Sequence, residues 1–304
     1  MTDVSTLTDA ERVTRLLPPA GPVRAVLDTD TYNEVDDQFA LAYALLAPER
    51  IALEAVYAAP FHNKRSESPA DGMEKSYEEI EQLLSRLGMP DFPHFRGARA
   101  TMPDPQTPVE SETTEDLIAR GRRASSEARL TIIAIGAITN VASALVRAPD
   151  LAQTCNVVWL GGNYPGWPRS GEFNLNGDLE AARALFASGV PVYLVPARGV
   201  ASHLTTTGEE LAAHLNLDDP LCRFLYDRFV EYGPADTIWA KEIWDIAGVA
   251  WCVLPESVGS IPMPVPGIAD DGAFVMKPAE RFIRVAVELD RNAIYRDLTA
   301  RLTP

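Results

Sequence analysis

The sequence predicts an α/β protein: an open, mostly parallel sheet with helices on both faces, plus a helical part toward the C-terminus. Short apolar runs that suit buried strands alternate with segments of helical periodicity from Val23 onward, which is the pattern of strand–helix–strand units. The chain has 304 residues, and 46% of them are hydrophobic, so it can bury one continuous core.

Strands and helices alternate without a break in the first two thirds of the chain. Residues 1–21 form an N-terminal extension, in which a short amphipathic helix and a proline-rich turn lead into the first strand. Strands are expected at 23–27, 51–58, 92–96, 130–135, 157–160 and 191–196, with helices between them at 36–46, 72–87, 112–124, 139–146 and 179–188. Helical crossovers between successive strands place those strands parallel in one sheet.

The last third of the chain is mainly helical. Helices are expected at 208–215, 220–231, 242–253 and 293–301, with strands at 261–265 and 282–288. No internal repeat, low-complexity tract or long linker divides the sequence. Residues 1–304 are therefore expected to form a single domain.

The charge and the cysteine content exclude several classes of function. Lys and Arg number 27 against 43 Asp and Glu, a formal net charge of −16, which argues against a nucleic-acid partner because phosphate neutralisation needs a cationic surface. No apolar stretch approaches the roughly 18–20 residues of a bilayer span, and the N-terminus lacks the pattern of a secretory signal. Three scattered cysteines do not make a disulfide framework. We expect a cytoplasmic protein without a membrane partner.

An acidic loop follows the first expected strand. Asp28, Asp30, Asp36 and Asp37, together with Glu34, lie within ten residues between that strand and an apolar helix. Ligands bind at the carboxyl ends of the strands in an open parallel sheet, so this loop is placed at a binding crevice. Helix capping explains one or two of the aspartates. Repulsion among all of them is relieved by a cation, and carboxylate oxygens suit Ca²⁺ or Mg²⁺.

Two known families share features with this loop. Residues 27–31 (LDTDT) resemble the nucleophile loop of haloacid-dehalogenase-like phosphatases, with Asp28 as nucleophile and Asp30 as acid in a Mg²⁺-dependent reaction. Asp30 followed by Asp36, Asp37 and a long apolar helix resembles the opening motif of the inosine-uridine-type nucleoside hydrolases. The loop alone does not choose between these families.

Later segments favour the nucleoside hydrolases. Residues 135–140 (IGAITN) resemble the second block of that family, although helix capping is another role for the Thr and Asn. Residues 171–174 (GEFN) match the third block closely and residues 243–245 (IWD) resemble the fourth. The four blocks stand in the family's order over roughly residues 23–290. The late Lys and the acidic motif of the phosphatases are not found with suitable spacing.

This resemblance implies a fold, an activity and a set of site residues. The fold would be nucleoside-hydrolase-like with a Rossmann-like core, and the enzyme would hydrolyse the N-glycosidic bond of a ribonucleoside to free base and ribose. The metal would be Ca²⁺, bound by Asp30, Asp37, the backbone carbonyl of Ile135 and Asp245. Asp30 would also be the general base that takes a proton from metal-bound water. The implied ribose contacts are Asp36, Asn63 and Asn174 at the 2′ and 3′ hydroxyls and Glu172 at the 5′ side.

Two departures from the family pattern concern loops of the site. The loop between Asp30 and Asp36 is two residues longer and lacks the Pro-Gly turn, so Asn33 or Glu34 could become a metal ligand. The Asn that usually stands six residues before the Glu of the GEFN segment is Gly166 here. The 5′ end of the sugar is therefore expected to be bound differently.

A third departure concerns the leaving base. Trp244 stands where the family often has a His, and the purine-preferring branch of the family is similar in having Trp there. A flat aromatic face suits stacking on a bicyclic base, whereas packing in the core is the alternative role. Tyr164 and Trp167 are candidates for a second stacking face. The sequence thus predicts a purine-type nucleoside as substrate.

Two other functions stay open at this point. One is the Mg²⁺-dependent phosphatase described above. The other is a nucleoside- or sugar-binding protein that kept the metal site and lost catalysis. The family resemblance further implies nucleoside salvage and a homo-oligomer, either a dimer or a tetramer.

Overall fold

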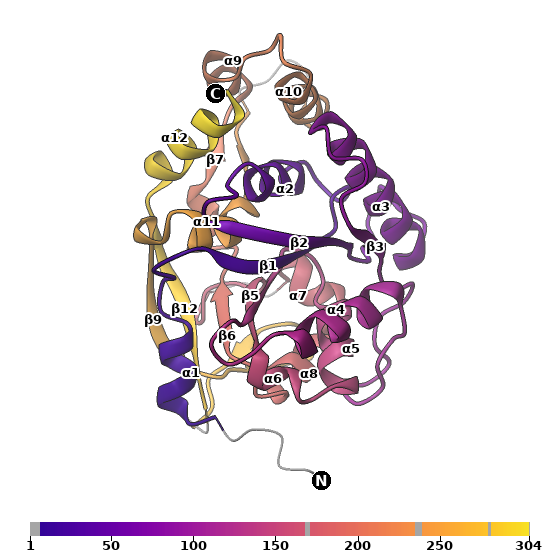
Figure 1. The fold of residues 1–304 in the computed structure, drawn as a ribbon, viewed down its shortest axis with the longest axis vertical. Coiled ribbons are helices and arrows are strands. Elements are labelled where there is room, and N and C mark those ends of the chain that lie inside the picture. The colour runs from indigo at the N-terminus through magenta and orange to yellow at the C-terminus, as the bar shows by residue number, and fades with distance from the viewer. Residues whose placement is uncertain (1–6, 168–170, 235–238, 279–280, 304) are drawn as a thin grey trace.

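The computed structural model describes residues 7–167, 171–234, 239–278 and 281–303. Its central sheet is built from β1 (Val23–Thr29), β2 (Ile51–Ala58), β3 (His94–Arg96), β4 (Leu130–Ala134), β5 (Cys155–Leu160), β6 (Val192–Val195), β9 (Val258–Pro264) and β12 (Phe282–Leu289). The strands lie in the order β3-β2-β1-β4-β5-β6-β12-β9 (Figure 1). Every neighbouring pair is parallel except β12 and β9. The predicted α/β fold with an open, mostly parallel sheet is confirmed.

The strand order reverses direction beside β1. The chain runs outward from β1 through β2 to β3, and then crosses back so that β4 pairs with the other edge of β1. Ligand-binding crevices of open α/β sheets lie outside the carboxyl ends of the strands at such a reversal. The acidic loop after β1 and the glycine turn after β4 therefore meet at the same place.

Two layers of helices cover the sheet (Figure 1). One layer contains α2 (Asp37–Leu45), α3 (Pro69–Arg86), α9 (Gly208–His214), α10 (Pro220–Tyr232), α11 (Ile246–Val253) and α12 (Arg291–Leu302); the other contains α4 (Glu112–Arg123), α5 (Thr139–Arg147), α6 (Leu151–Thr154) and α8 (Leu179–Ala187). The short helix α1 (Asp9–Arg15) contacts β12. Within the described residues, no helix is both long enough and apolar enough to cross a membrane.

The alternation of side chains along each strand produces two separate cores. Ile132 and Ile133 are adjacent in β4 and both fully buried, yet Ile132 packs in the core beneath α5 and Ile133 in the core beneath α11. Side chains at successive strand positions point to opposite faces of a sheet. A strand that is buried on both faces therefore shows a continuous apolar run, which is the pattern that the sequence has at 130–135.

Several boundaries differ from the sequence-based expectation. The helix expected at 242–253 begins only at Ile246, because β8 (Lys241–Glu242) pairs with β7 (Thr205–Thr206) and leaves the next residues in a turn. Helix α3 begins at Pro69, three residues earlier than expected, because the Ser68 side chain accepts a hydrogen bond from the backbone of Asp71. The helix α7 (Phe173–Gly177) and the strand pair β10 (Gly267–Ile268) and β11 (Phe274–Val275) were not expected.

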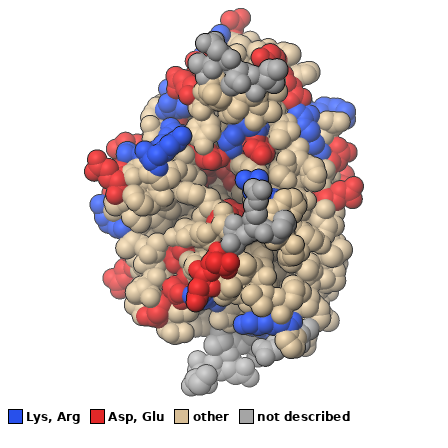
Figure 2. Space-filling model, turned by 180° about the vertical axis from the view of Figure 1, so that it is seen from behind, with Lys and Arg blue, Asp and Glu red and all other residues tan. Residues whose placement is uncertain are grey.

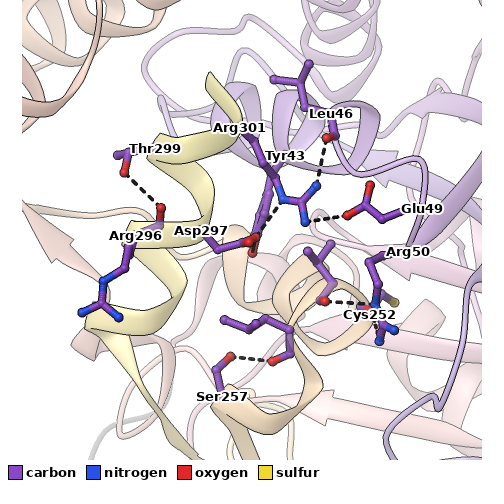
Figure 3. A network of polar contacts seen from close by, with 12 residues as sticks. Tyr43, Leu46, Glu49, Arg50, Cys252, Ser257, Arg296, Asp297, Thr299 and Arg301 are labelled. Atoms are coloured by element: carbon purple, nitrogen blue, oxygen red, sulfur yellow. Dashed lines mark hydrogen bonds and ion pairs between the residues drawn. The ribbon is translucent and has the colours of Figure 1, made fainter. Parts of the chain in front are cut away.

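The C-terminal helix α12 contacts the C-terminal end of α2 (Figure 3). Tyr43 donates a hydrogen bond of 2.7 Å to Asp297 on α12, and Arg301 donates one of 3.0 Å to the carbonyl oxygen of Leu46. Arg50, just beyond α2, donates to the carbonyl oxygen of Cys252 at 3.2 Å, at the end of α11. Asp36 and Asp245 directly precede α2 and α11. These contacts therefore help to position the two helices that follow the acidic residues.

Candidate active site

A pocket opens at the strand-order reversal, at the carboxyl ends of the strands. Its lining comes from the loop after β1, the turn after β4, the end of β5, the region of α7 and the turn before α11; it includes Asp30, Asp36, Asp37, Ile135, Leu160, Glu172, Asn174, Trp244 and Asp245. All of the predicted metal, catalytic and substrate-binding residues line this pocket except Asn63, whereas Tyr164 and Trp167, the candidates for a second stacking face, are not among its described lining residues. On the face shown in Figure 2, acidic side chains are visible inside a hollow with basic side chains beside it.

Three aspartates from two distant segments converge in the pocket. Asp36, Asp37 and Asp245 each offer a carboxylate oxygen within 4.8 Å of the others, and all three are buried. Thr29 donates a hydrogen bond of 2.5 Å to Asp37 Oδ1 and fixes its orientation. The sequence assigned Asp37 and Asp245 to a metal, and the structure brings them together. It adds Asp36, which the sequence assigned to ribose hydroxyls.

Burial and mutual repulsion raise the pKa values of these carboxyls. Burial raises the pKa of Asp37 to about 7, and the charge of Asp36 adds to that shift. Burial and the charges of Asp37 and Asp36 raise the pKa of Asp30 well above its ordinary value. Burial and the same neighbours do so for Asp245. Carboxylates crowded in this way hold protons unless a cation balances their charge.

Asp30 is poised beside the cluster of three aspartates. It is 1% exposed and lines the pocket, and its Oδ2 atom has no hydrogen-bond partner among the described residues. A buried carboxylate oxygen without a partner carries a large desolvation penalty. The oxygen-only donor set, the short distances and this unpartnered atom together fit a hard divalent cation such as Ca²⁺ or Mg²⁺.

Asp28 lies outside the pocket, although it is two residues from Asp30. It is fully buried and its Oδ1 accepts a hydrogen bond of 2.7 Å from Asn140. Asn140 also donates to the carbonyl oxygen of Ala58 and accepts from the backbone of Ala98. This amide therefore ties together the ends of β1 and β2 instead of capping α5. Asp28 is absent from the described lining of the pocket, so the geometry gives no support to its role as a phosphatase nucleophile.

Two residues of the lengthened acidic loop, Asn33 and Glu34, bond to residues from other segments of the chain. Glu34 forms an ion pair of 2.5 Å with Lys241 and accepts a hydrogen bond of 3.0 Å from the Tyr232 hydroxyl. Asn33 Oδ1 accepts a hydrogen bond of 2.6 Å from Asn63. The Glu34 carboxylate is thus engaged by Lys241 and Tyr232. Asn63 approaches the pocket only through Asn33, which lines it.

Glu172 and Asn174 organise the turn into α7. Glu172 accepts hydrogen bonds from the backbone amides of Gly162, Asn174 and Leu175, at 2.6, 2.9 and 2.8 Å, and so caps the helix. The Asn174 amide donates to the carbonyl oxygens of Ile135 and Leu160, both at 3.0 Å. The predicted metal-binding carbonyl of Ile135 is therefore oriented by Asn174. A carbonyl oxygen has a second lone pair that stays available for a metal.

Two cations flank Trp244, which lines the pocket beside Asp245. The ring centroid lies 5.6 Å from Lys241 Nζ and 5.9 Å from the Arg198 guanidinium carbon. Neither cation was predicted from the sequence, although Arg198 lies only three residues after the end of β6. Tyr164 and Trp167 do not line the pocket in the described residues. They pack against Gly199, where an added Cβ would lie 3.0 Å from Tyr164 and 3.3 Å from the Trp167 ring.

The comparisons with known proteins all identify nucleoside hydrolases, with different base preferences. The family model of inosine-uridine preferring nucleoside hydrolases matches residues 25–296. A pyrimidine-specific ribonucleoside hydrolase, RihA of Salmonella paratyphi A, is 28% identical over 261 residues, which cover 76% of this chain and 79% of the relative. A plant nucleoside hydrolase, PpNRh1, has a similar structure, with a TM-score of 0.75, 22% identity and coverage of 93% of this chain and 99% of the plant chain. A purine-preferring ribonucleoside hydrolase from Gardnerella vaginalis gives a TM-score of 0.75, 20% identity and coverage of 92% and 98%.

Proposed function

We propose that this chain, which belongs to the inosine-uridine preferring nucleoside hydrolase family, cleaves the N-glycosidic bond of purine ribonucleosides with the help of bound Ca²⁺. Membership of the family makes it an N-glycosyl hydrolase that acts on nucleosides. The observation that carries the finer proposal is the position of Trp244, one residue before an aspartate of the buried acidic cluster. An aromatic ring that can stack on the base thus lies next to a cluster of carboxylates that suits the hydroxyls of the sugar.

The acidic end of the pocket supplies the proposed metal ligands. Asp30, Asp37, Asp245 and the carbonyl oxygen of Ile135 are the set that the sequence predicts, and Asp36 is close enough to join them. A divalent cation held by these residues would lower the pKa of a bound water molecule. Ca²⁺ accepts six to eight oxygen ligands in flexible geometry. A cluster of carboxylates with a backbone carbonyl suits it.

The chain's own residues perform the remaining steps. Asp30 takes a proton from the attacking water, for which its unpartnered Oδ2 is suited. Asp36 and Asn174 hold the 2′ and 3′ hydroxyls of ribose, and Asn63 supports them through Asn33. Glu172 lines the pocket, and its carboxylate is held in place by the backbone amides of Gly162, Asn174 and Leu175. We assign it to the 5′ hydroxyl.

Trp244 is proposed to bind the base by stacking. Replacing it with Ala should lower kcat/KM for inosine by roughly 5- to 100-fold, because base–aromatic stacking contributes about 1–3 kcal/mol. Trp244→Phe keeps an aromatic face and should retain most of the activity. Release of ribose reports the rate, and thermal unfolding reports the fold. A Trp244→Ala protein with a lowered Tm and an unchanged rate would show that the ring only packs in the core.

A nucleoside panel tests the proposed function. Inosine, guanosine, adenosine, uridine and cytidine are each incubated with the enzyme, and free ribose is measured by its reducing end. We expect the purine nucleosides to be cleaved faster than the pyrimidine nucleosides. Cleavage of uridine far ahead of inosine would refute the purine preference. Tight binding of a nucleoside without any release of ribose would instead identify a non-catalytic relative.

Three further properties belong to the same proposal and rest on the family resemblance. We expect the enzyme to assemble as a homodimer or homotetramer. We also expect it to work in the cytoplasm, in nucleoside salvage. Light scattering of the purified protein tests the assembly directly.

A further inference from the structure

Arg198 is an exposed, positively charged residue that lines the acidic pocket. Six carboxylate side chains line the pocket, and Arg198 is the only positively charged residue among its described lining residues. We infer that the Arg198 guanidinium binds the departing base and selects 6-oxopurines, the bases of inosine and guanosine. This inference rests on the proposed function and names the substrate class more narrowly.

The backbone of Arg198 is fixed while its side chain is exposed. Its amide donates to Asn163 Oδ1 at 3.3 Å, and its carbonyl oxygen accepts from the amide of Tyr164 at 3.0 Å. The next residue, Gly199, has φ of +90°, a conformation that turns the chain and favours glycine. The side chain is exposed, and its guanidinium forms no ion pair with any described carboxylate. It is therefore available to a ligand.

The other cation near Trp244 is already engaged. Lys241 is 8% exposed at its side chain, pairs with Glu34 and donates to the carbonyl oxygen of Glu242 at 2.9 Å. Its charge neutralises the acidic loop, because Asp36 and Glu34 are the charges that raise its pKa against the effect of burial. Of these two cations, only Arg198 is free to meet a base stacked on Trp244.

The expected position of the base follows from the residues that line the pocket. In the proposed function Asp36 and Asn174 bind the ribose and Trp244 stacks on the base, so Arg198, beside the Trp244 ring, is the cation that the base meets. The guanidinium carbon is 5.9 Å from the Trp244 ring centroid. A purine lying against the indole would place its imidazole and carbonyl edge within reach of the guanidinium.

Cleavage of the N-glycosidic bond leaves a negative charge on the base, which the Arg198 guanidinium can stabilise. The water oxygen bonds to C1′ while the C1′–N9 bond breaks, and the bonding electron pair stays on the base. Asp30 receives one proton of the water, the other remains on the new C1′ hydroxyl, and the base anion later takes a proton from solvent. Arg198 stays protonated throughout and donates two hydrogen bonds that disperse the charge of the departing base.

Two N–H donors of the Arg198 guanidinium match the acceptors on one edge of a 6-oxopurine. Hypoxanthine and guanine present two adjacent acceptors, N7 and O6, to which an Arg side chain bonds in a bidentate manner. Adenine presents N7 beside an amino group, so one of the two donors would face another donor. The wild-type enzyme is therefore expected to cleave inosine and guanosine faster than adenosine.

Substitution of Arg198 tests the inference with three substrates. Arg198→Gln should lower kcat/KM for inosine by roughly 10- to 100-fold, the usual effect of losing a charge-assisted pair, and should reduce the preference of inosine over adenosine. Arg198→Lys should recover part of the rate but not the preference. Hydrolysis of p-nitrophenyl ribofuranoside should change by less than about threefold, because nitrophenolate departs without help. The control is Arg123→Gln, an exposed residue on α4, which should match the wild type.

Each contrary result has a separate meaning. Absence of ribose release from every nucleoside by the wild type would refute the proposed function itself. An active wild type whose Arg198→Gln variant keeps both its rate and its base preference would refute only the inference. An equal loss on inosine and on the nitrophenyl riboside would assign Arg198 to the sugar or the fold.

Discussion

Asp30→Asn is expected to lower kcat for nucleoside hydrolysis by roughly a thousandfold or more while the protein stays folded. A positioned general base contributes about 10²–10⁴-fold to a rate, and the same substitution also removes a proposed metal ligand. Asn has nearly the same shape as Asp, so the buried site is not emptied. Ribose release under saturating inosine measures kcat, and circular dichroism with thermal unfolding measures the fold.

Electrostatics predicts the sign of the change in stability that Asp30→Asn causes. Burial and the charges of Asp37 and Asp36 raise the pKa of Asp30, so its ionised form is unfavourable in the cation-free protein. Removing the carboxylate relieves this repulsion, and we expect the Tm of the chelated variant to equal or exceed that of the wild type. A variant with near-normal turnover would end the assignment of Asp30 as base. A variant that fails to fold would contradict the electrostatic argument.

Asp28→Asn is the matched comparison for this experiment. Asp28 is a buried aspartate two residues away, bonded to Asn140 and absent from the described pocket lining. Its replacement should lower nucleoside hydrolysis far less than that of Asp30. A phosphatase that uses Asp28 as nucleophile predicts the opposite order, together with turnover of a generic phosphomonoester.

The sequence was sufficient to predict the sheet and most of the residues that line the pocket, because both depend on local patterns. Apolar runs at 130–135 and 191–196 fixed the buried strands, and polar clusters directly after strands identified Asp30 and Asp37. Position after a parallel strand brings such residues to one edge regardless of their separation along the chain. The segment at 171–174 was identified by its resemblance to the third block of the family.

The remaining features depend on contacts between distant segments. Glu34 was a candidate ligand by its type, but Lys241 and Tyr232, some 200 residues later, engage it instead. Residues 241–242 form a two-residue strand that only its partner β7 defines. A pairing of that length leaves no periodic signal in the sequence. The helix expected from residue 242 was therefore placed too early.

The sequence also could not predict the role of a residue whose type suits several roles. Glu172 was assigned to the 5′ side of ribose, and in the structure its carboxylate caps the five-residue helix α7. A helix of that length has too few turns to show an apolar face. Arg198 is a single cation at a strand end, and only its position beside Trp244 gives it a function to test.

Removal of divalent cations is expected to abolish nucleoside hydrolysis, and added Ca²⁺ is expected to restore it. The acidic cluster offers oxygen donors within 4.8 Å of one another from Asp36, Asp37 and Asp245. Binding of a cation to the folded state alone also raises the stability, by about 2.7 kcal/mol at a hundredfold excess over Kd. The Tm of the Ca²⁺-loaded protein should exceed that of the chelated protein by roughly 5 °C, given the usual relation of free energy to Tm.

The gap between the two Tm values should widen as the pH rises from about 5 to 8. Burial raises the pKa of Asp37 to about 7 in the cation-free fold, against roughly 4 in an unfolded chain. Between these values the folded state holds a proton that the unfolded state has lost, so the stability of the chelated protein falls as the pH increases. The cation must displace that proton to bind, so its own contribution grows over the same range.

Thermal unfolding with Ca²⁺ and with a chelator, at several pH values, measures this dependence. Asp245→Asn is the matched variant, because it removes one donor of the cluster while nearly preserving the shape of the side chain. This variant should lose most of the Ca²⁺-dependent rise in Tm. Its chelated form should be at least as stable as the chelated wild type, because burial and the charges of Asp36 and Asp37 raise the pKa of Asp245. A wild-type Tm that is independent of Ca²⁺, together with full activity in the chelator, would refute the metal site. A gap that narrows as the pH rises would refute the assignment of raised carboxyl pKa values to this cluster.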